Sequence, residues 1–532
     1  SHPCSCVVML SCLAAPAGTT LVHGETLLPE GGLGLKSVRT ELLAKVQNLS
    51  PATPGLLLCA STGSGKSKDL PSMLAKAFGA TFVVTPFKAD VRSMAAFATV
   101  GCRYQVGCEE EAGSHPKETS LRICSAGLAC KKVLKDASFL RTMSVVVLDE
   151  IDVTSENPSY AMLFEKCMYE ARRRPLQHPL RIILTSATPS AASLELVATG
   201  DALLFKYSGR RFPVETATVQ CEDVDAALLD LARQAAVLGL SSLLFCLGEE
   251  ECERAVSMLK EAGVQAEAVH GKLENEEIAE ALRPKCYTRV LCGTSIAERA
   301  ITQPDIVLAL DPGLSRQSTD LNGVLEFVDL PAPAAVETQR RGRVGRVAPG
   351  AYIRAVRCGT VESAKEKQPT AEEVLEGYAI GMPTLGVRLC RVREETAEVA
   401  QLLATSLFRT RKSCREAFLG YPLSLANAAA LDAAKEPRGW WDVRWEASAI
   451  ASLLETGACK KTTDVQLALR VMEAELPYEV VKENFGLRRL KAARELHSEI
   501  CSRTGVWRRS RMSSVEVEEA LALAFLRSPL QL

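Results

Sequence analysis

The sequence has no long hydrophobic run, since no apolar stretch among its 532 residues reaches the roughly 18 residues that a membrane-spanning helix needs. It has no excess of charge either, with 63 Lys and Arg, 64 Asp and Glu, and a formal net charge of −1. A chain with this net charge has no overall electrostatic attraction for nucleic acid, so any nucleic-acid binding must come from local patches and backbone contacts. We therefore predict a protein without a transmembrane segment.

Metal-binding and secretory patterns are also missing. The six histidines include no HxxxH pair, and the nineteen cysteines are scattered without paired CxxC spacing. This pattern argues against a zinc site and favours free thiols in a reducing compartment, so we expect a cytoplasmic protein. The apolar stretch at residues 4–17 lacks a positively charged start, and we interpret it as a short strand or extension rather than a secretory signal.

Composition and length indicate a globular protein of about three domains, with 47% apolar and 24% charged residues. From about residue 56 to residue 357, strand-like apolar runs alternate with helical segments, which predicts parallel sheets with helices on both faces. The runs are 56–59, 82–84, 145–148, 181–184, 243–246, 289–292 and 306–310. We interpret RRFPV at residues 210–214 as a hinge between two tandem α/β units, since proline forces an extended linker.

After about residue 359 the alternating strands stop and helical patterns dominate. Predicted helices span residues 371–380, 394–408, 423–434, 447–454, 463–475, 487–501 and 514–525. We therefore predict an N-terminal extension at 1–34, α/β domains at 35–209 and 210–359, and a mainly helical domain at 360–532.

A phosphate-binding loop is predicted at residues 60–67, which read ASTGSGKS between an apolar run and a helix-compatible stretch at Leu70–Phe78. A glycine-rich turn after a strand exposes backbone N–H groups, and the following helix adds the positive end of its dipole. Lys66 is placed to reach the β- and γ-phosphates and Ser67 to hold Mg²⁺. The predicted cofactor-binding residues of this loop are Ala60, Ser61, Thr62, Gly63, Ser64, Gly65, Lys66 and Ser67.

The run 145–148 ends in Asp149-Glu150-Ile151-Asp152. Acids at the carboxyl end of a buried parallel strand lie at the ligand crevice of an α/β sheet. Asp149 would bind Mg²⁺ through water, and Glu150 would orient and deprotonate the attacking water. A solvated acidic loop is the alternative, but the upstream Lys66 favours the functional interpretation.

A basic element follows at residues 339–346, which read QRRGRVGR. Four arginines in seven residues are costly to pack together without an anion. On a helix, Arg343 and Arg346 lie three residues apart on one face, so they could grip a γ-phosphate as arginine fingers do. The alternatives are a basic surface helix or a nuclear-localisation-like patch, but the two glycines argue against a plain basic helix.

The segments ASTGSGKS, DEID, TSATP (residues 185–189) and QRRGRVGR, in this order, resemble motifs I, II, III and VI of superfamily 2 DExH-type helicases. Further segments resemble motifs Ia, Ib, IV and V, at 84–86, 125–127, 244–271 and 293–299. The resemblance covers roughly residues 50–360. It implies two tandem RecA-like domains followed by a mainly helical third domain, with Gln339, Arg343, Arg346 and Glu150 as catalytic residues.

The QRRGRVGR element and the helical tail look most like helicases of positive-strand RNA viruses. The flavivirus and hepacivirus non-structural helicases, the potyviral cylindrical inclusion helicase and hypovirus-like enzymes are the families that they resemble. The chain departs from these patterns at Asp152, where viral and DEAH enzymes usually have His, and at Ser295, where Asp or Asn is common. RRFPV, IAERAIT and DPG also resemble cellular DEAH RNA helicases, so a cellular origin stays open.

The resemblance also implies that a single strand lies across both α/β domains beneath the third domain. Thr85, Ser125 and Thr294 would meet the backbone of the strand, a contact that carries little sequence information. Trp440 and Trp441, with Trp445, are candidates for base stacking, and the alternative is that they form core of the helical domain.

The resemblance thus implies an NTP-dependent RNA helicase that hydrolyses ATP with Mg²⁺ in the cleft of the two RecA-like domains. Its partners would be single-stranded or partly duplex RNA and other viral replication proteins, at replication complexes in a host cell. Three alternatives stay open: a translocase or remodeller without strand separation, a cellular DEAH-type RNA helicase, and an RNA-binding scaffold with an inactive NTPase site.

Overall fold

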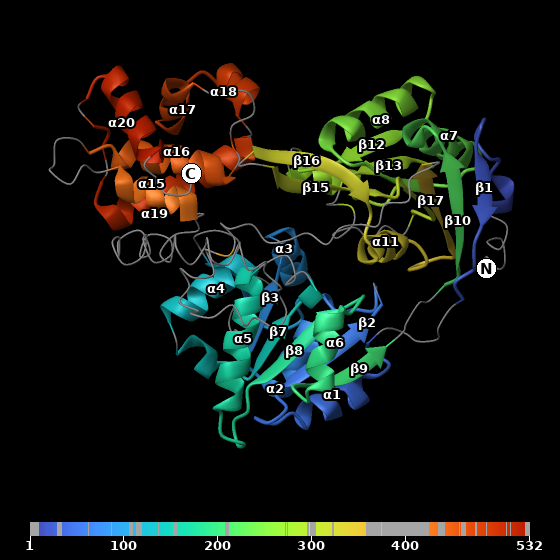
Figure 1. The fold of residues 1–532 in the computed structure, drawn as a ribbon, viewed down its shortest axis with the longest axis horizontal. Coiled ribbons are helices and arrows are strands. Elements are labelled where there is room, and N and C mark those ends of the chain that lie inside the picture. Colours follow the sequence, from blue (N-terminus) through green and yellow to red (C-terminus); the bar gives the residue numbers. More distant parts are fainter. Residues whose placement is uncertain are drawn as a thin grey trace. The chain divides into compact units, whose positions relative to one another are not determined.

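The fold is known from a computed structural model, drawn in Figure 1. The residues that it describes are 10–28, 35–61, 63–86, 88–105, 110–112, 120–136, 138–152, 158–207, 212–271, 273, 275–294, 297, 305–321, 324–357, 374, 425–434, 442–456, 458, 464–473, 476–485, 487–506, 508–510 and 512–526.

The first sheet has eight strands in the order β5-β4-β6-β3-β7-β8-β2-β9. Their bounds are β2 (Gly55–Ala60), β3 (Thr81–Thr85), β4 (Cys102–Gln105), β5 (Glu110–Ala112), β6 (Leu121–Ser125), β7 (Val145–Leu148), β8 (Arg181–Ser186) and β9 (Ala202–Tyr207). β2 pairs in parallel with β9, and β3 pairs in parallel with β6 and β7, whereas β5 is antiparallel to β4. Every residue of β2, β3, β7 and β8 is buried, as expected for parallel strands covered on both faces.

Helices alternate with these strands along the chain. They are α1 (Arg39–Gln47), α2 (Leu70–Phe78), α3 (Lys88–Ala96), α4 (Ala126–Lys135), α5 (Pro158–Arg172) and α6 (Ala191–Ala198), with a 3-10 helix η2 (Phe139–Thr142) before β7. α3 and α4 pack against β6, and α6 packs against β9. The predicted βα alternation is therefore confirmed, and α2 has the bounds predicted for the helix after the glycine-rich turn.

The second sheet has seven strands in the order β1-β10-β17-β14-β11-β13-β12. Their bounds are β1 (Thr20–His23), β10 (Val214–Cys221), β11 (Ser242–Phe245), β12 (Ala266–Val269), β13 (Val290–Gly293), β14 (Leu308–Asp311) and β17 (Gly350–Arg357). β10, β17, β14, β11, β13 and β12 pair in parallel, as predicted. The helices between them are α7 (Val224–Val237), α8 (Glu249–Glu261), α9 (Asn275–Ala281) and α11 (Ala334–Arg341).

The N-terminal residues belong to this second sheet. β1 runs antiparallel to β10, with Thr20 opposite Gln220. Ahead of it, the 3-10 helix η1 (Leu10–Cys12) buries Leu10 in the core beneath α7 and α8. The stretch at residues 4–17 was predicted to be a strand or extension; its described part contains η1, and the strand begins later, at Thr20. The domain boundaries at 34, 209 and 359 stay a prediction.

A long antiparallel hairpin, which the sequence patterns did not predict, joins β14 to α11. It consists of β15 (Leu314–Leu321) and β16 (Val324–Pro331). The side chain of Arg316 binds Asp329, the residue opposite it in the hairpin, and also Glu251 at the start of α8. These ion pairs fix the base of the hairpin to the second sheet's own helix.

The described C-terminal residues are helical. The helices are α15 (Leu425–Ala433), α16 (Arg444–Thr456), α17 (Val465–Met472), α18 (Tyr478–Asn484), α19 (Leu487–Thr504) and α20 (Ser514–Leu526). α16 is central, because it packs against α15, α17, α19 and α20. Five of the predicted helices are confirmed here and α18 was not predicted, whereas the helices predicted at 371–380 and 394–408 lie outside the described residues. None of the helices in the described ranges has the length and apolarity that crossing a bilayer requires.

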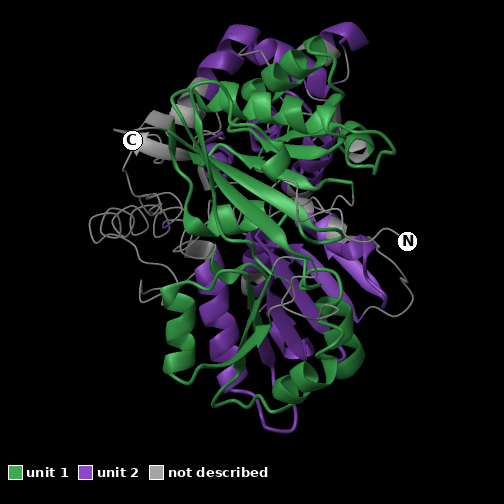
Figure 2. Ribbon diagram, turned by 90° about the vertical axis from the view of Figure 1, so that its right-hand side faces the viewer, with its two compact units in different colours: residues 1–77, 149–152, 183–367 green, residues 78–148, 153–182, 368–532 purple. Residues whose placement is uncertain are grey.

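Two compact units make up the chain, and Figure 2 colours them separately. The first unit comprises residues 1–77, 149–152 and 183–367, and the second comprises residues 78–148, 153–182 and 368–532. The glycine-rich turn, the four-residue acidic segment and the arginine-rich element all belong to the first unit.

Candidate nucleotide-binding site

The predicted phosphate loop follows β2 and leads into α2. Gly63 and Gly65 have φ angles of +77° and +101°, a region that glycine enters without strain. A Cβ atom at Gly65 would lie 2.7 Å from Asp69 Oδ2, so a side chain there would displace the Asp69 carboxylate as well as strain the backbone. Inside the turn, the buried Ser64 hydroxyl has no hydrogen-bond partner among the described residues. A buried hydroxyl without a partner is available to a ligand that can accept its hydrogen bond, such as an anion.

Lys66 is buried, and its ammonium group folds back onto the loop. Nζ donates to the carbonyl oxygen of Ala60 at 2.5 Å and to that of Ser61 at 3.2 Å. Burial lowers the pKa of Lys66, and the carboxylates of Glu150 and Asp149 oppose this shift. A buried cation that is held only by carbonyl oxygens can exchange them for phosphate oxygens at little cost. Thr62 lies outside the described residues.

Asp149 is buried directly after β7 and accepts hydrogen bonds from two elements. Ser67 Oγ donates to Oδ2 at 3.2 Å, and Thr185 Oγ1, near the end of β8, donates to Oδ1. Burial raises the pKa of Asp149, whereas the Thr185 hydrogen bond and the Lys66 charge lower it. The Ser67 hydroxyl and the Asp149 carboxylate thus lie together as predicted, and oxygen donors of this kind suit Mg²⁺. In the described part of the chain, no cluster of three or more His, Cys, Asp or Glu could hold a metal ion by itself.

Glu150 has a φ angle of +49°, the one non-glycine residue of the described chain in this left-handed region. Its backbone N–H donates to Thr185 Oγ1 at 3.3 Å, so Thr185 binds both acidic residues. Strained backbone of this kind persists only where the surroundings hold it, and such residues cluster at functional sites. The segment TSATP at residues 185–189 is a weak signal by itself in the sequence. In the structure its first residue, Thr185, is hydrogen-bonded to both acidic residues.

Asp152, where His was expected, is fixed by three serines. Its Oδ1 accepts from Ser190 N at 2.7 Å and from Ser193 Oγ at 3.0 Å, and its Oδ2 accepts from Ser186 Oγ. Ser190 also caps α6 by accepting from Ser193 N. Sequence reasoning missed Ser190 and Ser193, although a serine just before an apolar helix is a recognisable N-cap signal.

The arginine-rich element is not one helix, which corrects the prediction. α11 ends at Arg341, and Gly345 has a φ angle of +73°. A Cβ atom at Gly345 would lie 2.4 Å from Val214 Cγ2, so this turn packs too closely against β10 for any other residue. Arg343 and Arg346 therefore follow the helix in a turn instead of sharing one helical face.

Arg346 lies against the phosphate loop within the first unit. Its Nε donates to the carbonyl oxygen of Gly342 at 2.6 Å, and a Cβ atom added to Gly63 would lie 3.3 Å from Nε. Burial, followed by the charge of buried Arg343, lowers the pKa of Arg346. After burial, the charges of Arg346 and Arg343 also lower the pKa of Lys66, so three cationic side chains lie within electrostatic range of one another. Such a cluster of cations with perturbed pKa values suits an anionic ligand. Gln339 is half-buried on α11.

Not every arginine of this element needs a bound anion. Arg340 is buried and pairs with the protein's own Asp311, at 2.5 Å from Nη1 to Oδ1. Contrary to the expectation for all four arginines, Arg340 therefore requires no bound anion, because a buried carboxylate already compensates its charge.

The predicted RNA-contacting hydroxyls lie at the carboxyl ends of strands. Thr85 and Ser125 are the last residues of β3 and β6 and lie opposite each other in the parallel ladder. Both are buried, and Thr85 Oγ1 donates to Asp90 Oδ2 at 3.4 Å. Thr294 follows β13 and donates its backbone N–H to Val269 O at 3.1 Å. Their role in RNA binding stays a prediction.

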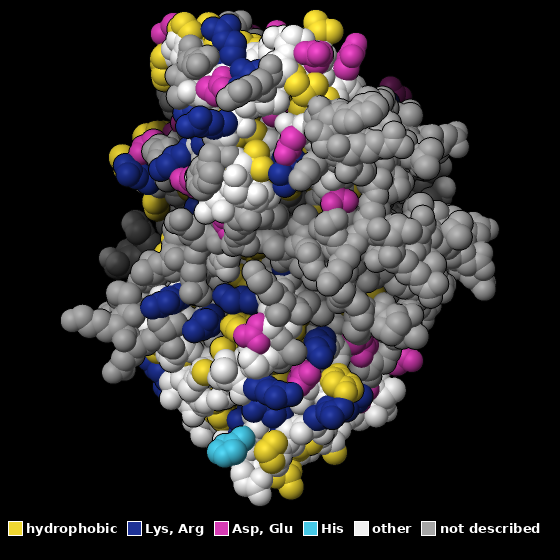
Figure 3. Space-filling view, turned by 90° about the vertical axis from the view of Figure 1, so that its left-hand side faces the viewer, with side chains coloured by type: hydrophobic (Ala, Val, Ile, Leu, Met, Phe, Trp, Pro, Cys, Tyr) yellow, Lys and Arg dark blue, Asp and Glu magenta, His cyan; other side chains and the backbone are white. Residues whose placement is uncertain are grey.

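Of the tryptophans, Trp440 and Trp441 lie outside the described residues. Trp445 is buried on α16 and meets the ring of His497 edge-on, with 4.8 Å between the ring centroids. For Trp445 the structure therefore supports the core alternative. In Figure 3, Lys and Arg side chains on the described part of one face are interspersed with Asp and Glu, as the net charge of −1 suggests.

Comparison with known proteins adds three findings. Residues 226–348 match the family model for the helicase conserved C-terminal domain. The chain is 26% identical over 335 residues to a protein of Haemophilus influenzae named ATP-dependent RNA helicase HrpA homolog, covering 58% of this chain and 25% of that protein. The chain therefore spans a quarter of the length of this relative.

Two solved structures from Escherichia coli share the fold at 20% identity. The DEAH/RHA helicase HrpB has a TM-score of 0.73 and covers 93% of this chain, which spans 63% of it. The DExH-box NTPase HrpB has a TM-score of 0.69 and covers 94% of this chain, which spans 62% of it. These similarities indicate a mixed α/β fold with parallel RecA-like sheets of the helicase kind.

The comparisons overturn the viral interpretation. The similar proteins are bacterial HrpA- and HrpB-type proteins, so the expected viral family, viral replication role and viral partners are wrong. The motifs around Lys66, Asp149 and Arg346 serve the same phosphate chemistry in viral and cellular enzymes, and they could not separate the two. RRFPV, IAERAIT and DPG, which resemble cellular DEAH enzymes, were the better guide.

Proposed function

We propose that this chain is an ATP-dependent RNA helicase of the cellular DEAH/RHA type. The observation that carries the proposal is the polar network around Asp149, which accepts hydrogen bonds from Ser67 and Thr185. Burial lowers the pKa of Lys66, which lies close enough to Asp149 for the charge of that carboxylate to oppose this shift. The helicase-domain match and the similarity to a protein named as an ATP-dependent RNA helicase support the same function.

In this proposal the phosphate groups of ATP replace the loop carbonyls as partners of Lys66. The backbone N–H groups of the turn around Gly63 and Gly65 face the phosphates, together with the unsatisfied Ser64 hydroxyl. Ser67 and Asp149 would hold Mg²⁺, which would supply positive charge to the phosphate oxygens. In this arrangement the cation Lys66 faces the phosphate oxygens, and the anion Asp149 faces the Mg²⁺ ion.

Glu150 orients the attacking water and takes its proton. The left-handed backbone at Glu150 is held by Thr185, whereas the Asp149 carboxylate accepts from Ser67 and Thr185, so the two acids have different surroundings and can have different roles. Gln339 helps to position the water. Arg343 and Arg346 stabilise the negative charge that builds up on the transferred phosphoryl group.

For RNA, the proposal uses Thr85, Ser125 and Thr294 as contacts to the strand backbone, and Trp440 or Trp441 as a stacking platform. The position of Thr85, Ser125 and Thr294 at the carboxyl ends of parallel strands supports the contacts to the strand backbone, because ligands bind at that edge of α/β sheets. The C-terminal helices form a third domain in this proposal. A cytoplasmic location is proposed as well, in line with the free thiols of the described cysteines.

The test measures ATP hydrolysis by the full chain with and without single-stranded RNA, together with displacement of a strand from duplexes with 3′ or 5′ overhangs. Lys66→Ala is the control, because it removes the charge that meets the phosphates. RNA-stimulated hydrolysis with strand displacement supports the helicase. Hydrolysis without displacement would identify a translocase or remodeller instead, and RNA binding without hydrolysis would leave a scaffold.

A further inference from the structure

A buried charge network lies next to the arginine-rich element, on the second sheet. Arg340 Nη1 donates to Asp311 Oδ1 at 2.5 Å, and the hydroxyl of Tyr352 donates to Asp311 Oδ2, also at 2.5 Å. The backbone N–H of Gly313 donates to Oδ1 at 2.8 Å. Arg340, Asp311 and Tyr352 are 3%, 0% and 2% exposed, so water does not screen this network.

Three elements meet in this network. Asp311 is the last residue of β14, Tyr352 lies on the neighbouring β17, and Arg340 lies in the last turn of α11. The guanidinium group also donates to Leu314 O at 2.8 Å, at the start of the hairpin, and it lies 5.3 Å from the ring centre of Phe245. Arg340 thereby fastens the end of α11 to the carboxyl edge of the sheet.

Stability alone does not account for such a network. Apolar side chains of similar volume often stabilise a buried position as well as or better than an ion pair, because both charges lose their hydration. The network instead fixes an orientation, because the Asp311 carboxylate accepts hydrogen bonds from three donors that come from different parts of the chain. Burial, and next the charge of Asp311, raise the pKa of Tyr352, which keeps its hydroxyl a proton donor.

The arginines proposed to meet the phosphate begin three residues after this anchor. Arg343 N donates to Arg340 O at 3.0 Å, and Arg346 Nε donates to Gly342 O at 2.6 Å. The backbone at residues 340–342 therefore holds the main chain of Arg343 and the guanidinium group of Arg346. A shift of the helix end would displace both carbonyl groups, and with them the start of the turn that carries the two arginines.

We propose that Arg340, held by Asp311 and Tyr352, is a positioning residue that sets the places of Arg343 and Arg346 for the transferred phosphoryl group. The inference rests on the proposed function, because it requires that these two arginines act on the phosphate. According to this inference, the buried network of Arg340, Asp311 and Tyr352 affects the rate of ATP hydrolysis although none of the three residues contacts the nucleotide.

The experiment uses the full chain with two substitutions, Arg340→Lys and the milder Tyr352→Phe. Lysine keeps the charge but loses the planar guanidinium group that donates to Asp311 and Leu314 and lies over the Phe245 ring, so the helix end can shift. A misplacement of about 1 Å lowers turnover on the order of 10²-fold, which is the fall in kcat expected for Arg340→Lys. A smaller fall in the same direction is expected for Tyr352→Phe. The KM for ATP and the affinity for ADP should change little.

Two readouts separate positioning from general destabilisation. The affinity for ADP with aluminium fluoride, which mimics the transferred phosphoryl group, should fall in both variants whereas the affinity for ADP alone does not. In a double-mutant cycle, adding Arg340→Lys to Arg346→Ala should lower kcat far less than Arg340→Lys does alone, because the group that it positions is already gone.

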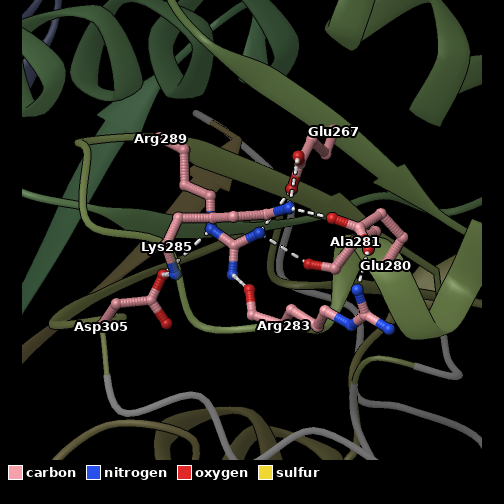
Figure 4. Close-up of polar contacts among 7 residues, drawn as sticks. All are labelled: Glu267, Glu280, Ala281, Arg283, Lys285, Arg289 and Asp305. Atoms are coloured by element: carbon pink, nitrogen blue, oxygen red, sulfur yellow. Dashed lines mark hydrogen bonds and ion pairs between the residues drawn. The ribbon is translucent and has the colours of Figure 1, made fainter.

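Arg289→Lys is the matched control, and Figure 4 shows the polar contacts of Arg289. Arg289 is equally buried and pairs with two carboxylates, Glu267 and Asp305, with Nε to Asp305 Oδ2 at 3.0 Å. It lies directly before β13, at the amino end of the parallel strands, whereas Asp311 lies at their carboxyl end. This control should lower the melting temperature of the protein but leave kcat unchanged below it.

Wild-type kcat and wild-type affinity for the fluoride complex in Arg340→Lys and Tyr352→Phe would overturn the inference. So would a loss of kcat that Arg289→Lys reproduces, or a double mutant in which the two losses simply multiply. Absence of ATP hydrolysis by the wild-type chain would overturn the proposed function itself, which makes the two failures distinguishable.

Discussion

Ser67 and Asp149, 82 residues apart in the sequence, meet at 3.2 Å from Oγ to Oδ2. Ser67 is exposed in the loop before α2, whereas Asp149 is buried at the end of β7. The pair brings the hydroxyl and carboxylate oxygens that Mg²⁺ prefers to one point beside the phosphate loop.

Asp149→Asn should therefore raise the Mg²⁺ concentration that half-maximal ATP hydrolysis requires, because the amide is a weaker ligand than the carboxylate. Ser67→Ala should act in the same direction. Titration of Mg²⁺ at fixed ATP measures both effects, and chelation with EDTA should abolish hydrolysis. An unchanged Mg²⁺ dependence in Asp149→Asn would rule out the assigned metal site.

Lys66→Ala should weaken ATP binding and abolish hydrolysis, whereas Glu150→Gln should still bind ATP but hydrolyse it orders of magnitude more slowly. The glutamine keeps the size of the side chain but cannot accept a proton. Fluorescent-nucleotide binding and single-turnover hydrolysis separate the two phenotypes. Normal turnover by Glu150→Gln would mean that another group is the base.

Arg343→Ala and Arg346→Ala should each lower turnover by about 10³-fold or more, with a much smaller loss of nucleotide affinity. The reason is that both arginines meet charge that develops only in the transition state. Arg341→Ala is the matched control within the same segment and should stay near wild type. Equal losses of affinity and turnover would instead indicate ground-state binding.

Trp445→Ala should destabilise the C-terminal helices by about 3–5 kcal/mol, because it leaves a cavity beside His497. Trp445→Phe should cost less, since it keeps an aromatic ring. Thermal unfolding and single-strand RNA affinity are measured on both, and on Trp440→Ala and Trp441→Ala. One of the latter two should weaken RNA binding by about 1–3 kcal/mol without loss of stability if it stacks on a base. If neither does, the stacking hypothesis fails.

The stability of the C-terminal helices should depend on His497. Burial lowers the pKa of His497 to about 4, below its ordinary value of about 6.5. Between these values the unfolded chain binds a proton that the folded chain does not, so stability rises with pH from about 4 to 6.5, by up to about 3 kcal/mol. All four tryptophans follow residue 439, so urea unfolding monitored by tryptophan fluorescence reports on these helices. His497→Gln should flatten the pH dependence, and an unchanged slope would contradict the assignment to His497.

Local patterns sufficed for the strands β2, β3, β7, β8, β11, β13 and β14 and for the acids after β7, but not for the other strands of the two sheets or for the hairpin. The buried runs at 145–148 and 181–184 could be recognised because parallel strands are apolar on both faces, and Lys66 because a glycine-rich turn before a helix has a narrow range of uses. The motif chemistry also indicated a helicase, but it could not separate a viral from a cellular origin, since both use the same phosphate-binding groups.

Long-range packing decided the rest. The sequence by itself determined which residues of this protein carry charge, which runs are buried and where the phosphate loop lies. Only the tertiary structure decided that Arg340 pairs with Asp311, that three serines hold Asp152, and that α11 ends at Arg341, before Arg343 and Arg346. The physical reason is that propensity and periodicity act over a few residues, whereas the partner of a buried charge comes from wherever the sheet brings a carboxylate.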